Sequence, residues 1–229
     1  MRWWFKLLVI IDGLLSPDTV QSVGSILKDA KFISGAHSAG KMATQVKNNT
    51  ELPVDASQCN KLNQLVMGAL VNHPTFKNAA LPHRVAAPYY SCYTSGMQYG
   101  EHIDDPIMGE GALYRSDVSI TVFLSNPSHY DGGELCVKTG FGEQQIKLPA
   151  GSAVLYPSSS LHRVNEVSRG IRYAAVTWVQ SLVKRADQRE ILFDLASVRD
   201  ELTTQAPEAD NTSRIEHSYV NLVRMWSEV

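Results

Sequence analysis

The sequence predicts a mainly β fold with flanking helices, in which a jelly roll is followed by a C-terminal helical hairpin. Two observations predict it. Residues 84–181 contain eight short apolar or alternating segments separated by turn residues, which is typical of a jelly roll. After residue 181 the apolar residues recur at helical spacing instead. With 229 residues, 44% of them hydrophobic, the chain can bury one substantial core.

The N-terminal segment is predicted to form a strand and a helix. Residues 1–11 look superficially like a secretion signal, but Lys6 interrupts the apolar run and Asp12 follows it without a cleavage site, so we expect a buried strand. Pro17, preceded by a serine cap, is predicted to open a helix over about 17–29, where apolar residues recur with helical spacing.

Residues 34–53 show no clear period and are predicted to form a loop with at most one strand, around 41–46. A second helix is predicted around Leu62–Leu70, ending near His73-Pro74. The two helices should brace one face of the sheet.

Eight strands are predicted between Arg84 and Gln180, each rich in β-branched or aromatic residues. They cover residues 84–94, 99–103, 117–124, 133–138, 143–148, 152–156, 161–166 and 170–180.

The C-terminal segment is predicted to form two amphipathic helices. Two sets of apolar residues each fit one helical face. The sets are Ile191, Leu192, Leu195, Val198 and Leu202, then Ile215, Tyr219, Leu222, Val223 and Trp226. The hairpin can cover the core or a sheet edge, or form a homo-oligomer interface, and the spacing alone does not distinguish these roles.

The predicted organisation is therefore one catalytic unit with an extension. Residues 1–83 form its N-terminal strand and bracing helices, residues 84–181 the jelly-roll core, and residues 182–229 the C-terminal helical extension.

Composition excludes several partners. A net charge of −2 and the lack of any basic run argue against nucleic-acid binding. No stretch approaches the ~20 apolar residues that a membrane helix needs. The cysteines, Cys59, Cys92 and Cys136, are odd in number and lack a C-x-x-C pattern, so we expect free thiols and a cytoplasmic location.

His102, Asp104 and His162 carry the strongest chemical signal. Side chains alternate along a strand, so His102 and Asp104 are expected on one face, with His162 arriving from a distant strand. Two imidazoles and one carboxylate make a facial triad that leaves coordination positions open, which suits non-haem Fe(II). Asp105 would point the opposite way. His37, His73, His83, His129 and His217 have no partner at ligand spacing.

Arg172 lies within an apolar strand, where an arginine is rarely buried unless it is paired. Its guanidinium matches a carboxylate in a bidentate fashion. A protein acid could be that partner. The distal carboxylate of 2-oxoglutarate, chelated to the metal through its other end, is the alternative that also uses the open metal positions.

Three stretches resemble the Fe(II)/2-oxoglutarate dioxygenases of the prolyl 4-hydroxylase-like group, and within it the bacterial PKHD-type hydroxylases. They are Tyr99–Asp104, Tyr130–Leu135 and Gly151–His162, and the similarity continues through Arg172 and Trp178 to the C-terminal tail.

The resemblance implies a double-stranded β-helix with Fe(II) on His102, Asp104 and His162, and 2-oxoglutarate anchored by Arg172. It also implies a hydroxylation that releases succinate and CO2. Further implications are a role for the Tyr93 hydroxyl in holding 2-oxoglutarate, a requirement for L-ascorbate and a link to iron uptake. A packed barrel tyrosine is the other interpretation of Tyr93.

Two competing functions remain at this point. One is a non-catalytic iron-binding or iron-sensing jelly roll, and the other a cupin-type dioxygenase that does not use 2-oxoglutarate. Both leave the predicted burial of Arg172 unexplained. Whether the substrate is a small molecule or a peptidyl group does not follow from any residue. Arg115 and Asp117 either contact substrate or form a surface pair.

Overall fold

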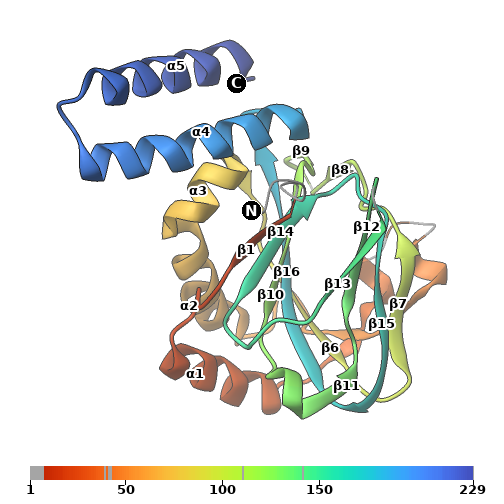
Figure 1. Ribbon diagram of the computed structural model, residues 1–229. Helices are drawn as coiled ribbons and strands as arrows, with labels where there is room; N and C mark the ends of the chain where they lie inside the picture. Colours follow the sequence, from red (N-terminus) through yellow and green to blue (C-terminus); the bar gives the residue numbers. More distant parts are fainter. Residues whose placement is uncertain (1–7, 39, 41–42, 110, 141, 229) are drawn as a thin grey trace.

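The structure is a computed structural model that describes residues 8–38, 40, 43–109, 111–140 and 142–228 (Figure 1). Two antiparallel sheets face each other and form the body of the molecule. The larger sheet has the strand order β1-β14-β10-β16-β6-β4-β2, with β5 pairing with β16. Its strands are β1 (Val9–Ile11), β14 (Ala153–Pro157), β10 (Val118–Phe123), β16 (Arg172–Ser181), β6 (Tyr89–Tyr93), β4 (Thr50–Glu51), β2 (Ile33–Ser34) and β5 (Pro82–Val85).

The smaller sheet has the order β13-β12-β15-β7-β3, with β11 pairing with β15. Its strands are β13 (Gly142–Ile146), β12 (Leu135–Thr139), β15 (His162–Gly170), β7 (Met97–His102), β3 (Lys47–Asn48) and β11 (Tyr130–Gly132). A separate two-stranded ribbon consists of β8 (Ile107–Met108) and β9 (Tyr114–Arg115). The predicted jelly-roll class is confirmed.

Three helices, α1 (Pro17–Lys28), α2 (Cys59–Asn72) and α3 (Pro74–Ala80), cover the outer face of the larger sheet (Figure 1). Ser16 caps α1 by accepting a hydrogen bond from the backbone of Thr19. Leu62, Val66 and Leu70 recur on one face of α2, and all three are buried in the same apolar cluster as the sheet residues Ile120 and Val122. The helices therefore close one side of the core.

A second apolar cluster contains residues of both sheets. It includes Phe123 and Val154 of the larger sheet, and Leu135, Val164 and Val167 of the smaller one. The polar side chains described below lie between the same two sheets.

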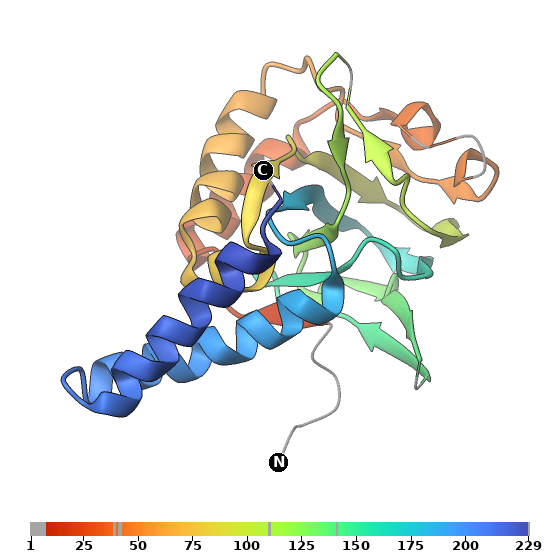
Figure 2. The same ribbon diagram turned by 90° about the horizontal axis from the view of Figure 1, so that it is seen from above.

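Two C-terminal helices, α4 (Ala186–Gln205) and α5 (Asp210–Trp226), lie side by side and project away from the sheets (Figure 2). The predicted hairpin is therefore confirmed. Leu192, Ala196 and Tyr219 pack with Leu81 and Val183 in a third apolar cluster, which joins the hairpin to the rest of the chain. None of the described helices combines the length and the apolar character that a bilayer crossing requires.

Several local predictions differ from the structure. The strand expected around 41–46 is wrong, because Ala43–Gln45 forms a 3-10 helix and the strands β3 and β4 follow it. The strand expected over 84–94 is two strands, β5 and β6, separated by a segment that contains Pro88, which has no N–H to donate. Pro74 ends α2 but also occupies the first position of α3, which was not predicted. Of the N-terminal strand, only Val9–Ile11 falls within the described residues.

Candidate metal centre

His102 and His162 are brought together by strand pairing. His102 is the last residue of β7, His162 is the first residue of β15, and the two are partners in the antiparallel register. Their ring centroids are 4.2 Å apart. Asp104 completes the group, because one ligand atom from each of the three residues lies within 4.8 Å of the others. No other such group of histidines, cysteines and acids occurs among the described residues.

Asp104 joins this group for a reason that differs from the strand alternation expected from the sequence. The strand β7 ends at His102, so Asp104 lies in the irregular segment that follows. Its carboxylate accepts a hydrogen bond from the hydroxyl of Ser119, and its Oδ1 lies 3.8 Å from Nε2 of His162. Asp105 is exposed and is not part of the three-ligand group, although it also lines the cavity.

Hydrogen bonds to backbone carbonyls orient both imidazoles. Nδ1 of His102 lies 2.8 Å from the carbonyl oxygen of Gly100, and Nδ1 of His162 lies 2.9 Å from that of Ser160. A carbonyl oxygen can only accept, so Nδ1 is the protonated nitrogen in each ring. The Nε2 lone pair of each histidine is therefore free to bind a metal, and such backbone bonds are the usual outer support of histidine ligands.

The environment keeps His102 neutral. Burial, reinforced by the neighbouring His162, lowers the pKa of His102 from 6.5 to about 4. The ring of Tyr99 stacks on His102 with centroids 3.6 Å apart and planes 14° from parallel. Two imidazoles and one carboxyl group form a donor set that fits Fe(II).

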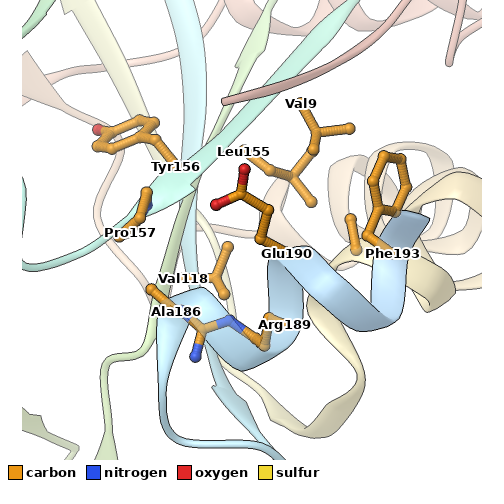
Figure 3. Close-up of a pocket in the computed structure, with 10 residues that line it drawn as sticks. Val9, Val118, Leu155, Tyr156, Pro157, Ala186, Arg189, Glu190 and Phe193 are labelled. Carbon is orange, nitrogen blue, oxygen red and sulfur yellow. The ribbon is translucent and has the colours of Figure 1, made fainter. Parts of the chain in front are cut away.

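The three residues open into a cavity of about 590 Å³, within the usual size range of ligand sites. Tyr93 and Arg172 line the same cavity. A much smaller cavity, of about 30 Å³, lies where α4 meets β10 and β14 and contains none of the three residues (Figure 3). It has room for about one water molecule.

Arg172 is only 2% exposed, yet its Nε has no hydrogen-bond partner and it takes part in no ion pair between described residues. The alternative of a protein acid as its partner therefore finds no support in the described part of the chain. A buried cation without an anion is costly. The site consequently fits a ligand carboxylate at this end of the cavity.

Tyr93 faces Arg172 across the pairing of β6 with β16. Burial raises the pKa of the Tyr93 phenol to about 12, although the positive charge of Arg172 opposes this. The phenol is therefore protonated at neutral pH and can donate a hydrogen bond. A ligand carboxylate beside Arg172 could accept that bond.

The cavity runs along β16. Arg172, Val176 and Trp178 share one face of this strand, and all three line the cavity. Trp178 pairs in register with Ser119, whose hydroxyl holds Asp104. Arg172 is the first residue of β16, and Trp178 lies farther along the same strand. The register with Ser119 places Trp178 near Asp104 and the other metal ligands. The rings of Trp178 and Tyr89 meet edge-on with centroids 5.8 Å apart, and the indole N–H of Trp178 has no hydrogen-bond partner among the described residues.

Arg115 and Asp117, considered as substrate contacts or a surface pair, have a structural role instead. Nε of Arg115 lies 2.7 Å from Oδ1 of Asp117, and Asp117 is buried. The other carboxylate oxygen of Asp117 accepts a hydrogen bond of 2.9 Å from the backbone N–H of Ser181. The pair therefore stabilises the C-terminal end of β16.

Two side chains of the site were missed by sequence reasoning. Ser119 could have been found, because a serine within the apolar strand 118–123 must hydrogen-bond when it is buried. Asn49 is buried and lines the cavity, but it lies in a segment without a recognisable period.

Two family descriptions match this chain. Residues 88–180 match the 2OG-Fe(II) oxygenase superfamily, and residues 187–228 match the PKHD-type hydroxylase C-terminal domain. The second match covers most of the α4–α5 hairpin.

Curated relatives match over nearly their full length. A PKHD-type hydroxylase from Thioalkalivibrio sulfidiphilus is 47% identical over 224 residues, which is 97% of this chain and 100% of the relative. One from Synechococcus sp. (strain JA-2-3B'a(2-13)) is 44% identical with the same coverage. A relative from Pseudomonas putida (strain W619) is 40% identical over 226 residues, again 97% of this chain and 100% of the relative.

Solved structures share the fold at low identity. A prolyl hydroxylase from Trichoplax adhaerens has a TM-score of 0.58 at 17% identity, covering 82% of this chain and 87% of that one. A Pseudomonas putida prolyl-4-hydroxylase has a TM-score of 0.53 at 18% identity, covering 76% and 92%. The solved structures support the fold alone, whereas the family descriptions and the full-length relatives show that the chain belongs to the PKHD-type hydroxylases, which are Fe(II)- and 2-oxoglutarate-dependent oxygenases.

Proposed function

We propose that the chain hydroxylates an unactivated C–H bond of its substrate while 2-oxoglutarate is converted to succinate and CO2. His102, Asp104 and His162 would hold the Fe(II). One observation carries the proposal: a three-ligand group with open positions shares its cavity with a buried, unpaired guanidinium. A purely iron-binding protein would have no use for Arg172.

The residues of the chain would bind and orient the reactants. Arg172 would hold the distal carboxylate of 2-oxoglutarate by a bidentate contact, and Tyr93 would donate a further hydrogen bond. Fe(II), when bound, supplies the activation of dioxygen and the oxidising power of the reaction. The imidazoles of His102 and His162 would keep their Nε2 atoms directed at the metal through their carbonyl contacts. Burial between the two sheets would limit access of water.

The substrate would enter at the end of the cavity opposite to Arg172. Trp178 and Tyr89 offer aromatic surface there, and the cavity wall continues to the partly exposed β8 through Ile107 and Met108. Such a wall fits an apolar or ring-shaped group of a small molecule or a peptide. The unpaired indole N–H of Trp178 would donate to an acceptor on that group.

We also propose a cytoplasmic role connected with iron uptake. The three cysteines are free and buried, which supports work in a reducing compartment. The link to iron uptake and a requirement for L-ascorbate rest on the family resemblance alone.

The substrate can be sought by comparing metabolites and peptides of wild-type cells and His102→Ala cells under iron limitation. The variant should accumulate a compound that is one oxygen atom lighter than a product found only in the wild type. Conversion of that compound by the purified protein, with a matching yield of succinate, would confirm the proposal. A protein that makes no succinate with any extract would refute it.

A further inference from the structure

Asp104 is the metal-site residue with the least backbone support. It follows the end of β7, and its neighbours Ile103 and Asp105 are both exposed, so no strand pairing holds it. His102 and His162, by contrast, are fixed as register partners. The orientation of the Asp104 carboxylate must therefore come from contacts of its own side chain.

Ser119 supplies such a contact from the centre of the larger sheet. Its backbone is held on both sides, by Tyr156 of β14 and Trp178 of β16, and its side chain is fully buried. Its hydroxyl lies within hydrogen-bond distance of Oδ2 of Asp104 and is 2.7 Å from the hydroxyl of Ser158, which is also buried. A rigid strand thus presents a hydroxyl to a carboxylate on a less ordered segment.

The direction of the two hydrogen bonds follows from counting protons. A serine hydroxyl has one proton, and an ionised carboxylate can only accept. The Ser119 hydroxyl has donor geometry toward both Asp104 and Ser158, and its single proton can serve only one of them at a time. With that proton on Asp104, the 2.7 Å contact is a hydrogen bond only when Ser158 turns its own proton toward Ser119. Linked bonds of this kind polarise and strengthen one another in a buried environment.

The outer end of this chain of bonds is held by the C-terminal hairpin. The backbone carbonyl of Asp117 accepts from the N–H of Ser158 at 3.2 Å and from Nη2 of Arg189 at 3.1 Å. Arg189 belongs to α4, is 5% exposed, and also donates to the carbonyls of Val183 and Lys184. Figure 3 shows Arg189 near Val118 and Pro157, the strand residues next to Asp117 and Ser158 in the sequence.

We propose that Ser158 and Ser119 form a buried relay that orients the Asp104 carboxylate for metal binding, and that Arg189 anchors its outer end. This inference rests on the proposed metal site. The inference gives the α4–α5 hairpin a role in the chemistry, because the first turn of α4 would hold the backbone at Asp117, and through it Ser158, in place. Ser119, Ser158 and Arg189 are thus positioning residues that do not touch the metal.

Titration of the metal-free full chain with Co(II), followed by the visible spectrum and the dissociation constant, tests the relay without using activity. Loss of an outer hydrogen bond to a ligand typically weakens metal binding 10- to 100-fold, and we expect this for Ser119→Ala together with an altered Co(II) spectrum. Ser119→Thr keeps the hydroxyl and should restore most of the affinity. Ser158→Ala leaves the bond from Ser119 to Asp104 and should weaken binding about two- to tenfold.

Matched controls separate the relay from a general loss of stability. Ser125→Ala removes another buried serine, whose hydroxyl accepts a hydrogen bond of 2.8 Å from the backbone N–H of Tyr173, and should leave Co(II) affinity unchanged. Arg189→Met should weaken Co(II) binding about two- to tenfold, whereas Arg185→Met, which breaks an exposed pair with Asp187 at the start of the same helix, should not.

The outcomes also separate the relay from the metal site itself. If Asp104→Ala binds Co(II) as tightly as the wild type, the proposed metal site is wrong. If Asp104→Ala loses Co(II) while Ser119→Ala and Ser158→Ala keep wild-type affinity and spectrum, only the relay is wrong. If Ser119→Ala fails to fold, the other two variants decide. Wild-type Co(II) affinity in Ser158→Ala overturns the relay. Weaker Co(II) binding by Ser158→Ala, together with near-normal binding by Ser119→Thr, supports it.

Discussion

Arg172 lies opposite Tyr93 on neighbouring strands, with its guanidinium carbon 5.1 Å from the centre of the phenol ring. The ring of Phe123 approaches the same guanidinium carbon at 5.5 Å. Aromatic faces attract a cation but do not replace an anionic partner. The relationship explains how a buried arginine is tolerated without a protein acid, and it leaves the hydrogen-bonding edge of the guanidinium for a ligand.

The first prediction concerns Arg172→Ala. Its affinity for Fe(II) should stay near that of the wild type because no metal ligand is lost. Charge-assisted hydrogen bonds contribute about 1.5 to 3 kcal/mol, so 2-oxoglutarate should bind about ten- to more than a hundredfold more weakly. Anaerobic calorimetric titration of the iron-loaded protein measures this loss.

Arg172→Lys serves as the control for charge. It should restore only part of the affinity, because an ammonium lacks the planar fork. Thermal melts of the metal-free proteins distinguish a structural role, since breaking a buried ion pair would cost about 3 to 5 kcal/mol of stability even without 2-oxoglutarate. Normal binding of 2-oxoglutarate by Arg172→Ala would rule out the assigned role.

The second prediction compares two neighbouring carboxylates. With Fe(II) and 2-oxoglutarate under anaerobic conditions, the wild type should show a metal-to-ligand charge-transfer band. Asp104→Ala should abolish this band, whereas Asp105→Ala should retain it because Asp105 is exposed and outside the metal-binding group. Absorption spectroscopy decides, and equal loss in both variants would contradict the assignment of Asp104.

The sequence was sufficient for the jelly roll because each long strand has its own apolar pattern. The residues of 118–123, for example, are buried throughout and were predicted within one residue at each end. The pairing of His102 with His162 could be expected as chemistry but not as geometry, since strand register depends on contacts between distant segments.

The features that the sequence did not reveal have physical causes of the same kind. Asp104 was assigned to the metal by strand alternation, but the strand ends at His102 and a side-chain hydrogen bond from Ser119 does the positioning. Pro74 was interpreted only as a helix terminator, although proline also suits the first turn of a new helix. Whether Arg172 has an acidic partner depends on which Asp and Glu side chains the fold brings close to it. The local sequence around Arg172 does not contain this information.

The third prediction concerns pH. An unfolded His102 takes up a proton near pH 6.5, whereas the folded protein resists this until about pH 4. Between these values the unfolded state binds more protons, so the stability of the metal-free protein should fall as the pH drops and be fully present above about 6.5. At pH 5 the contribution of His102 is at most about 2 kcal/mol.

Denaturant unfolding of the wild type and of His102→Gln at pH 7.5 and pH 5 isolates this contribution. The wild type should lose more stability on acidification than the variant, which has no imidazole to protonate. An equal loss in the two proteins would show that the pKa of His102 is not lowered by folding.

The fourth prediction concerns the C-terminal hairpin. Leu192 is fully buried between α4 and the rest of the chain, so Leu192→Ala should cost about 2 to 5 kcal/mol of stability. The adjacent Ile191 is 48% exposed, and Ile191→Ala should change the stability by no more than about 0.5 kcal/mol. Truncation after Ser181 removes both helices and should expose Leu81, which packs against them, and lower solubility. Unchanged melting and sedimentation of the truncated protein would contradict this.

The last prediction tests the substrate end of the cavity through Trp178→Phe. The substitution keeps an aromatic ring but removes the unpaired indole N–H, and it touches neither the metal ligands nor Arg172. Affinities for Co(II) and 2-oxoglutarate should therefore stay within about twofold of the wild type. Substrate held less firmly should uncouple the reaction, so that more succinate forms per molecule of hydroxylated product.

Extracts of His102→Ala cells, which should contain the unmodified substrate, provide the assay mixture for this comparison. Succinate and the product that has gained one oxygen atom are quantified together by mass spectrometry. Trp226→Phe, on α5, is the matched control and should keep the wild-type ratio because Trp226 lies in the hairpin cluster and not in the cavity lining. A wild-type ratio in Trp178→Phe would place the substrate elsewhere, since the indole N–H at the level of the metal ligands would then have no part in holding it.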